Sequence, residues 1–499
     1  MSRNLAGRHL VLEVFALLFS NRWLEQWQKK WRAQKPSTGT SRSRPSRAAP
    51  RQAATPPQKQ KPAQGRFYER IFSLRVTLWY LIFQRLNFDS TQAAVVVNLR
   101  EGGANRLGRP RADKLSRRVR STQTSAYNQA RQRLPLELLQ DALAHLREVL
   151  LRLVGLEPVA QHKPGPFQRT RQILDGSTLA MLSTPELAKA YPPARNRSGA
   201  SDWCMMRILT GFCVRSGAVL SALQGAVQQS EQAMAWVLME QGARLTIWIG
   251  DRNFGIWSVV AQAVRFEQDV LVRLTKTRAA KLCAGRALTS GEERCIQWFP
   301  SRGDQGAPGI ERGAVSGRLI YVRLHKNGAW IHLWLFTTLD AKDYPLSLLV
   351  KWYGQRWQAE LHFRSVKTQM KMAELDVSTP QMARKEFYAG VLAYNLVRAV
   401  MWKAGARLEA GIKAISFSQA RRVLLEQLNQ WGRGLGTGAK TLEVWIGLLL
   451  EEIAQHTLPK RRQPRPTEIR KVRHRRQKFP AFRGSRTAAR ARDLIAKSS

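Results

Sequence analysis

Acidic residues are scarce in this chain. Its 499 residues include 35 Asp and Glu against 82 Lys and Arg, which leaves a net charge of +47. Such an excess attracts nucleic acid strongly and in a salt-dependent way. Anionic membrane surfaces and acidic proteins are alternative partners, but the charge favours nucleic acid over both.

Metal-binding motifs built from Cys and His are also lacking. The four cysteines form no Cys-x-x-Cys pair, and the eight histidines form no His-x-x-x-His or His-Glu-x-x-His motif. These absences argue against zinc fingers, zinc ribbons and the common metalloproteases. We expect all four cysteines to be buried as small apolar side chains in a reducing compartment.

Long hydrophobic runs are missing as well. The apolar stretch at residues 10–19 is too short to cross a membrane, contains Glu13, and is not followed by a small-residue cleavage site. We predict a short amphipathic helix within residues 1–27, with Trp23 and Trp27 on its flank. No membrane partner and a cytoplasmic, nucleoid-associated location are expected.

Two basic segments lack the composition of a folded core. Residues 26–68 contain no acidic residue and are rich in Ser, Pro, Gln, Ala, Lys and Arg. This composition predicts a disordered linker over residues 28–66, either a passive spacer or an arm that tethers DNA. The tail at residues 457–499 is predicted to be disordered and to bind nucleic acid without sequence preference.

Helical periodicity dominates two regions, residues 67–160 and 376–456. In the first, Ser90 is predicted to cap a helix that runs through residues 95–97. We expect this first region to bind DNA ends, and a dimerisation or packing bundle is the alternative.

Residues 168–375 change to the alternating pattern of strands. The predicted order is β-β-β-α-β-α-β, with a hairpin at 203–227 and a helix capped by Ser230. A β-rich insertion follows at about 276–342, with strands at 318–324 and 330–338, and then a helix at about 343–370. The predicted fold class is therefore α/β, a mixed sheet core with helical regions on both sides in the sequence.

Two aspartates stand at the strands of this core. Asp175 interrupts an apolar strand, where a lone carboxylate is costly unless it is paired or bound to a metal. Asp251 directly follows an apolar strand, where parallel sheets place ligand-facing residues. Each alone could be a turn or cap residue.

One edge of the predicted 343–370 helix carries a single acid among cations and a tyrosine. The residues at relative positions 0, 3, 7 and 14 are Tyr353, Arg356, Glu360 and Lys367. At about 100° per residue they fall within an arc of roughly 60°. Arg364 extends the stripe, whereas His362 falls on the opposite side and is not expected to bind a metal. An acid on this edge could join Asp175 and Asp251 around two Mg²⁺ ions.

These segments resemble a known family. Tyr353, Arg356, Glu360 and Lys367 match the Tyr-(2)-Arg-(3)-Glu-(6)-Lys signature of the IS-four group (insertion sequence 4 family) of bacterial DDE transposases. Asp-Gly-Ser-Thr at 175–178 and Asp-Arg-Asn-Phe-Gly at 251–255 look like the segments of its two aspartates. The resemblance covers about residues 90–405.

The resemblance implies a ribonuclease-H-like core and cut-and-paste DNA transposition. Asp175, Asp251 and Glu360 would be the catalytic residues and the ligands of two Mg²⁺ ions, with Mn²⁺ able to substitute and no nucleotide cofactor. The implied partners are double-stranded DNA, at terminal inverted repeats and target, and a second copy of the chain in the synaptic complex.

The resemblance also implies a set of residues that bind DNA. They are Tyr353, Arg356, Arg364 and Lys367, together with Trp330 or Trp334 as the platform for a flipped base. Both tryptophans could instead be core aromatics. Two other functions stay open, a DNA-binding remnant without activity and a nuclease without strand transfer.

Overall fold

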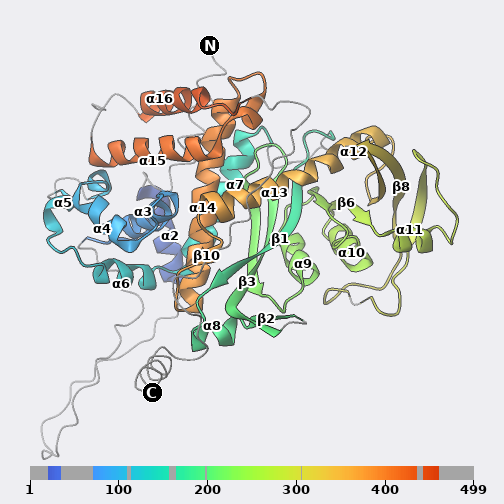
Figure 1. Ribbon diagram of the computed structural model, residues 1–499, viewed down its shortest axis with the longest axis horizontal. Coiled ribbons are helices and arrows are strands. Elements are labelled where there is room, and N and C mark those ends of the chain that lie inside the picture. Colours follow the sequence, from blue (N-terminus) through green and yellow to red (C-terminus); the bar gives the residue numbers. More distant parts are fainter. Residues whose placement is uncertain are drawn as a thin grey trace, which may run out of the picture. The chain divides into compact units, whose positions relative to one another are not determined.

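The computed structural model describes residues 21–34, 71–108, 114–156, 165–196, 199–304, 306–326, 328–434 and 442–459 (Figure 1). Met1–Thr457 form one compact unit and Leu458–Ser499 a second. All but the first seven residues of the predicted linker, and all but 457–459 of the predicted tail, lie outside the described residues.

A ten-stranded mixed sheet forms the centre of the first unit. Its order is β2-β3-β1-β5-β6-β9-β8-β7, with β4 paired to β3 and β10 paired to β1. The strands are β1 Arg171–Met181, β2 Pro193–Asn196, β3 Gly199–Cys213, β4 Val219–Ala226, β5 Ile247–Gly250, β6 Asp269–Leu274, β7 Glu293–Trp298, β8 Val315–Lys326, β9 Ala329–Thr337 and β10 Glu374–Leu375. The predicted α/β class with a mixed sheet is confirmed.

Strand direction changes across β1. β3 runs antiparallel to β1 and β4 antiparallel to β3, whereas β5 and β6 run parallel to β1. The predicted hairpin is confirmed as β3–β4, and its turn includes Gly217 at a φ of +69°, a value that favours glycine. The helices α9 (Glu231–Glu240) and α10 (Trp257–Arg265) connect β4 to β5 and β5 to β6.

The central strands are buried on both faces, which explains their apolar sequences. Ile173 belongs to the larger hydrophobic core, which it shares with the C-terminal helices, and Leu174 belongs to the core beneath α9 and α10. Ile249 and Trp248 alternate in the same way on β5. Consecutive residues of one strand therefore support two different helical layers.

The insertion contains more structure than its sequence predicted. The predicted strands are present as β8 and β9, but β7 and α11 (Lys276–Leu282) were not predicted. Exposed and half-buried residues alternate along β7 up to the buried Trp298, so it has no continuous apolar pattern. Cys295 on β7 is exposed, whereas Cys204, Cys213 and Cys283 are buried. The expectation that all four cysteines are buried is therefore wrong for Cys295, because it lies on the open side of an edge strand.

Helices precede and follow the sheet in the sequence. They are α2 Asn21–Gln34, α3 Leu74–Leu86, α4 Gln92–Arg100, α5 Leu115–Arg118, α6 Ser125–Arg133 and α7 Leu136–Leu153 before it, and α14 Pro380–Gly405, α15 Phe417–Arg433 and α16 Leu442–Gln455 after it. The short α8 (Pro185–Ala190) lies between β1 and β2. α2 extends beyond the predicted end at residue 27. None of the described helices is long and apolar enough to cross a membrane.

Local capping follows the sequence at one helix and not at another. Ser230 accepts a hydrogen bond from the Ala233 N–H at 3.1 Å, as predicted for the start of α9. The cap of α4 is Thr91, whose hydroxyl accepts from the Ala94 N–H at 3.2 Å. The prediction of Ser90 is wrong by one residue, since both residue types cap well and the tertiary path decides between them.

A buried ion cluster fastens the N-terminal helices to α14. Glu386 on α14 pairs with Arg85 of α3 at 2.7 Å and also with Arg131 of α6. All three side chains are buried. α14 also packs against α7, α15, α16 and β4, so it links the helices to the sheet (Figure 1).

Candidate active site

The candidate site lies where β1 runs on beyond the end of β5. Leu174 of β1 pairs with Gly250, the last residue of β5, and β10 begins to pair with β1 at Ala180. Asp175 and Asp251 are each the next residue along their strands. Because neighbouring parallel strands lie about 4.8 Å apart, the register brings these two acids to the same level of the sheet.

The surroundings of Asp175 disfavour its negative charge. Burial raises the pKa of the Asp175 carboxyl to about 6; the Gly176 N–H and the Arg356 guanidinium lower it, while Asp251 and Glu231 raise it further. The Gly176 N–H donates to Asp175 Oδ1 at 3.0 Å. A carboxylate that is half-buried and close to other acids is suited to bind a cation.

Asp251 begins a tight turn after β5. Its Oδ1 accepts the Asn253 N–H at 2.8 Å, and its carbonyl accepts the Phe254 N–H at 3.1 Å. Asp251 therefore has a turn role, and its second carboxylate oxygen is not used in these bonds. The turn fixes the position at which the carboxylate leaves the strand.

Three residues of the predicted helix edge face these aspartates. Tyr353 is buried, and its pKa is raised by burial, lowered by Arg356 and Arg273, and raised by Asp251. Lys367 Nζ lies 3.3 Å from the hydroxyl of Ser177, two residues beyond Asp175 on β1. The side chains of Tyr353, Arg356 and Lys367 thus lie around the end of β5.

The helix that carries them is not uniform. It consists of α12 (Leu346–Gly354), a 3-10 turn at Gln355–Trp357, α13 (Gln358–Arg364) and a π-helical turn at Ser365–Gln369. The expectation of one regular helix at 100° per residue is wrong, because 3-10 turns advance faster and π turns more slowly. This change in winding accompanies the approach of Lys367 to β1.

Glu360 is exposed on α13, as is Arg364. α13 packs against β1. Within the described ranges, no three His, Cys, Asp or Glu side chains lie close enough together to hold a metal ion. The structure thus pairs Asp175 with Asp251 but does not bring Glu360 to them.

His362 lies in the core. Its Nδ1 is 3.1 Å from the Tyr394 hydroxyl, and its ring centroid is 5.1 Å from that of Phe212. Burial, followed by the charge of Arg398, holds its pKa well below its usual value. His362 therefore packs α13 onto β3 and α14 and faces away from the aspartates.

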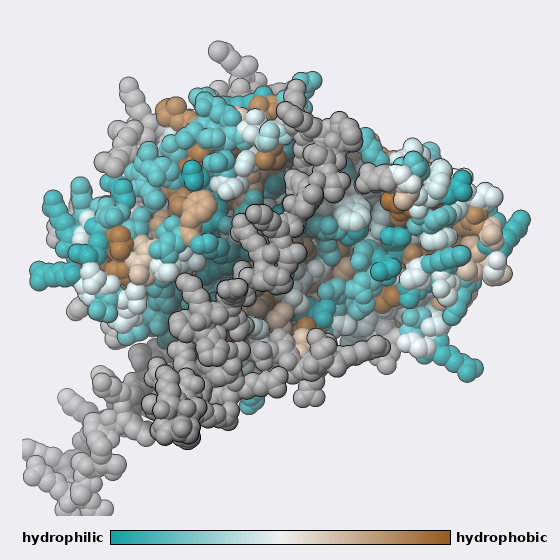
Figure 2. Space-filling model, in the orientation of Figure 1, coloured by the Kyte–Doolittle hydropathy of each residue, from teal (hydrophilic) through white to brown (hydrophobic). Residues whose placement is uncertain are grey.

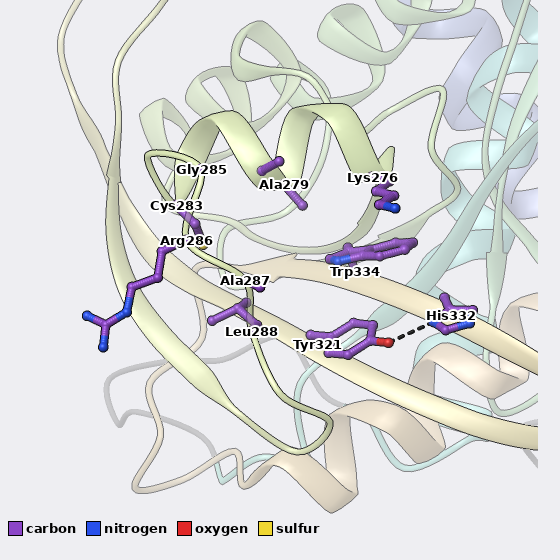
Figure 3. A pocket seen from close by; sticks show the side chains of 11 residues that line it. Lys276, Ala279, Cys283, Gly285, Arg286, Ala287, Leu288, Tyr321, His332 and Trp334 are labelled. Atoms are coloured by element: carbon purple, nitrogen blue, oxygen red, sulfur yellow. Dashed lines mark hydrogen bonds between the residues drawn. The ribbon is translucent and has the colours of Figure 1, made fainter.

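The two candidate tryptophans of the insertion have different environments. Trp330, near the turn between β8 and β9, is 56% exposed, and the Arg323 guanidinium lies 4.4 Å from its ring centroid. Trp334 is half-buried and stacks on Tyr321 at 5.3 Å. It lines a pocket of about 470 Å³ in which Tyr321 hydrogen-bonds His332 at 2.7 Å (Figure 3).

Sequence reasoning missed two residues that lie close to the site. Arg273 on β6 donates to the His332 carbonyl at 3.2 Å, and its charge lowers the pKa of Tyr353. It therefore connects the insertion to the site. Glu231 is the first residue of α9, and its charge raises the pKa of Asp175. An acid in the first turn of a helix is common, because the helix dipole favours it there. The position of Glu231 in the sequence therefore did not mark it as a site residue.

Comparison with known proteins relates the chain to transposases. Residues 166–396 match the family described as the transposase DDE domain. The transposase InsG of insertion sequence element IS4 from Escherichia coli (strain K12) is 25% identical over 313 residues, which cover 61% of this chain and 67% of that protein.

Two further likenesses are more limited. A putative transposase, y4zB, from Sinorhizobium fredii (strain NBRC 101917 / NGR234) is 25% identical over 167 residues, 32% of this chain and 44% of that protein. A cryo-EM structure of the piggyBac transposase synaptic complex with hairpin DNA aligns over 92% of this chain and 88% of that one, at 11% identity and a TM-score of 0.38.

The matched domain contains both strand-end aspartates and the helix that bears Tyr353, Arg356 and Lys367. Its name and the IS4 relative agree on the activity. The chain is a transposase with a DDE domain at residues 166–396, and it is similar to the transposase of IS4.

Proposed function

We propose that the chain catalyses cut-and-paste transposition of an insertion sequence. Water would attack the phosphodiester at each element end, and the freed 3′-OH would attack the opposite strand to form a hairpin, whose reopening precedes transfer into target DNA. The observation that carries this proposal is that Asp175 and Asp251 lie side by side on neighbouring strands. Tyr353, Arg356 and Lys367 lie around them. Such a reaction would take place at the nucleoid.

The proposed fold of the domain is ribonuclease-H-like. The supporting observation is the order β4-β3-β1-β5-β6, in which β1 has antiparallel neighbours on one side and parallel neighbours on the other. The first acid lies within the central strand and the second follows its parallel neighbour. This placement would bring both half-buried carboxylates to one point of the sheet.

DDE domains depend on divalent metal ions, and the residues present suit such an ion. Carboxylate oxygens are hard ligands, which Mg²⁺ prefers. Asp175 is half-buried, and the charges of Asp251 and Glu231 raise its pKa. Asp175 and Asp251 would hold Mg²⁺ or Mn²⁺, with Glu360 as the third proposed ligand. When bound, two such ions would activate the attacking oxygen and stabilise the leaving 3′ oxygen.

The cations around the site would hold the DNA backbone. Lys367 reaches β1 beside Asp175, and Arg356 lies near both Asp175 and Tyr353. Arg364 is exposed on the next turn of α13 and would contact phosphate farther along the strand. Lys and Arg contacts of this kind position the duplex without reading its sequence.

An exposed tryptophan of the insertion would receive an unstacked base. Trp330 is the favoured platform, because more than half of its side chain is exposed. Trp334 already stacks on Tyr321. The helices between residues 71 and 156 would bind the element ends, and two protomers would bring the two ends together.

The experiment uses a supercoiled plasmid that carries the gene with its native flanking DNA. Purified full-length protein and Mg²⁺ should release the element and insert it into a second plasmid. Nicking without insertion would indicate a nuclease, and gel-shift binding without cleavage would indicate a DNA-binding remnant. Either of these two results contradicts the proposal.

A further inference from the structure

Glu231 lies directly against the backbone beside Asp175. A Cβ placed on Gly176 would be 2.4 Å from both Cδ and Oε1 of Glu231, too close for any real contact. Gly176 therefore leaves the space in which this carboxylate rests. This close packing places Glu231 of α9 against Gly176, the residue that follows Asp175 on β1.

The Glu231 carboxylate is held by two donors from different elements. Oε1 accepts from Arg207 Nη1 of β3 at 2.9 Å, and Oε2 accepts from Asn253 Nδ2 at 2.8 Å. Gln232 donates to Asn253 Oδ1 at 2.6 Å, so the amide has one orientation, with its NH₂ group toward Glu231. Each oxygen of the carboxylate thus has a defined role.

Asn253 links Glu231 to the second aspartate. Its side chain donates to Glu231, and its backbone N–H donates to Asp251 Oδ1 at 2.8 Å. The path from Glu231 to Asp251 thus runs through one residue by two hydrogen bonds. A displacement of Asn253 would change the direction of the Asp251 carboxylate.

We infer that Glu231 is a positioning carboxylate of the active site, which fixes Asp251 through Asn253 for binding a divalent cation. The inference rests on the metal site of the proposed function. Because Arg207 and Asn253 already occupy its two carboxylate oxygens, Glu231 acts through Asn253 and not as a direct ligand. Outer hydrogen-bond partners of this kind typically change metal affinity by about 10–100-fold.

The test measures Mn²⁺ binding to the full-length protein without DNA, by electron paramagnetic resonance. Glu231→Ala and Asn253→Ala should each weaken Mn²⁺ binding by about tenfold or more, and the double variant should be no weaker than either single one. Excess Mn²⁺ should restore DNA cleavage by Glu231→Ala. The control is Glu240→Gln, an equal charge change at the exposed far end of α9.

Different failures have different meanings. If Asp251→Ala abolishes Mn²⁺ binding while Glu231→Ala binds within twofold of the unmodified protein, the role of Glu231 is refuted and the metal site stands. Fully additive effects of Glu231→Ala and Asn253→Ala would refute the route through Asn253. If Asp251→Ala binds Mn²⁺ as the unmodified protein does, the proposed metal site fails together with this inference. Thermal unfolding of each variant separates loss of binding from loss of fold.

Discussion

The ammonium group of Lys367 lies 3.3 Å from the hydroxyl of Ser177, although 190 positions separate the two residues in the sequence. This contact joins the π-helical turn after α13 to the strand that carries Asp175. A cation is thus placed within two residues of the first aspartate, where a phosphate bound at the site would meet it.

Lys367→Ala should therefore weaken DNA binding and flatten its dependence on salt. Loss of one phosphate contact should lower the slope of log K against log salt by about 1. Fluorescence anisotropy with an element-end duplex at several salt concentrations measures both quantities. Lys351→Ala, which removes an exposed lysine from α12, is the matched control. An unchanged slope for Lys367→Ala would exclude a phosphate contact.

Glu360→Ala should abolish Mg²⁺-dependent cleavage and leave DNA binding nearly intact. The side chain is exposed, so its removal should cost little folding stability. Cleavage of plasmid DNA and gel-shift affinity are measured side by side. Glu409→Ala, at an exposed acid outside the matched domain, should retain full activity. Full cleavage by Glu360→Ala would remove Glu360 from the catalytic set.

Asp175 should make the metal-free protein less stable as pH rises. Its pKa is raised from an ordinary 3.8 to about 6, so between these values the folded state binds more protons than the unfolded state. The free energy of unfolding therefore falls as pH rises through this window and stays lower above it. Asp175→Asn, which has no charge to bury, should be more stable than the parent by about 1–3 kcal/mol at pH 8 and equal to it near pH 4.

Urea unfolding with a chelator present at pH 4, 6 and 8 tests this dependence. The exposed Asp376 provides the control, since Asp376→Asn should show no such trend. A stability difference for Asp175→Asn that does not change with pH would show that burial does not raise the pKa of Asp175.

Trp330→Ala should lower DNA affinity without changing the melting temperature, because the side chain is mostly exposed. Base stacking on an aromatic ring is worth about 1–3 kcal/mol. Trp334→Ala should instead lower the melting temperature, since it removes the stacked contact with Tyr321. Thermal unfolding and binding to a duplex with an unpaired base distinguish the two. The opposite pattern would assign the base to Trp334.

Glu386→Gln should destabilise the fold by about 3–5 kcal/mol, because it leaves Arg85 and Arg131 buried without a countercharge. The midpoint of urea unfolding measures the loss. Glu409→Gln serves as the exposed control and should unfold like the parent. A midpoint for Glu386→Gln close to that of the parent would mean that the buried cluster contributes little to holding α3 and α6 on α14.

The sequence by itself determined the elements of the core and most of the residues that matter. Strand and helix periodicity are local, so the β3–β4 hairpin, the apolar strand β5 and the Ser230 cap of α9 could be read from neighbouring residues. The spacing of Tyr353, Arg356 and Lys367 was likewise visible along one segment. Their orientation did not follow from that spacing alone, because the winding changes along the segment and Glu360 stays exposed.

Only the tertiary structure decided which of these residues meet. Asp175 and Asp251 lie side by side because of the register between β1 and β5. Glu231 lies against Gly176 because of the way α9 packs on the sheet. Contacts between residues far apart in sequence set both, and local patterns do not encode them. The same cause left β7 and the changes of winding after Gly354 unpredicted, since edge pairing and helix packing arise only when the chain is folded.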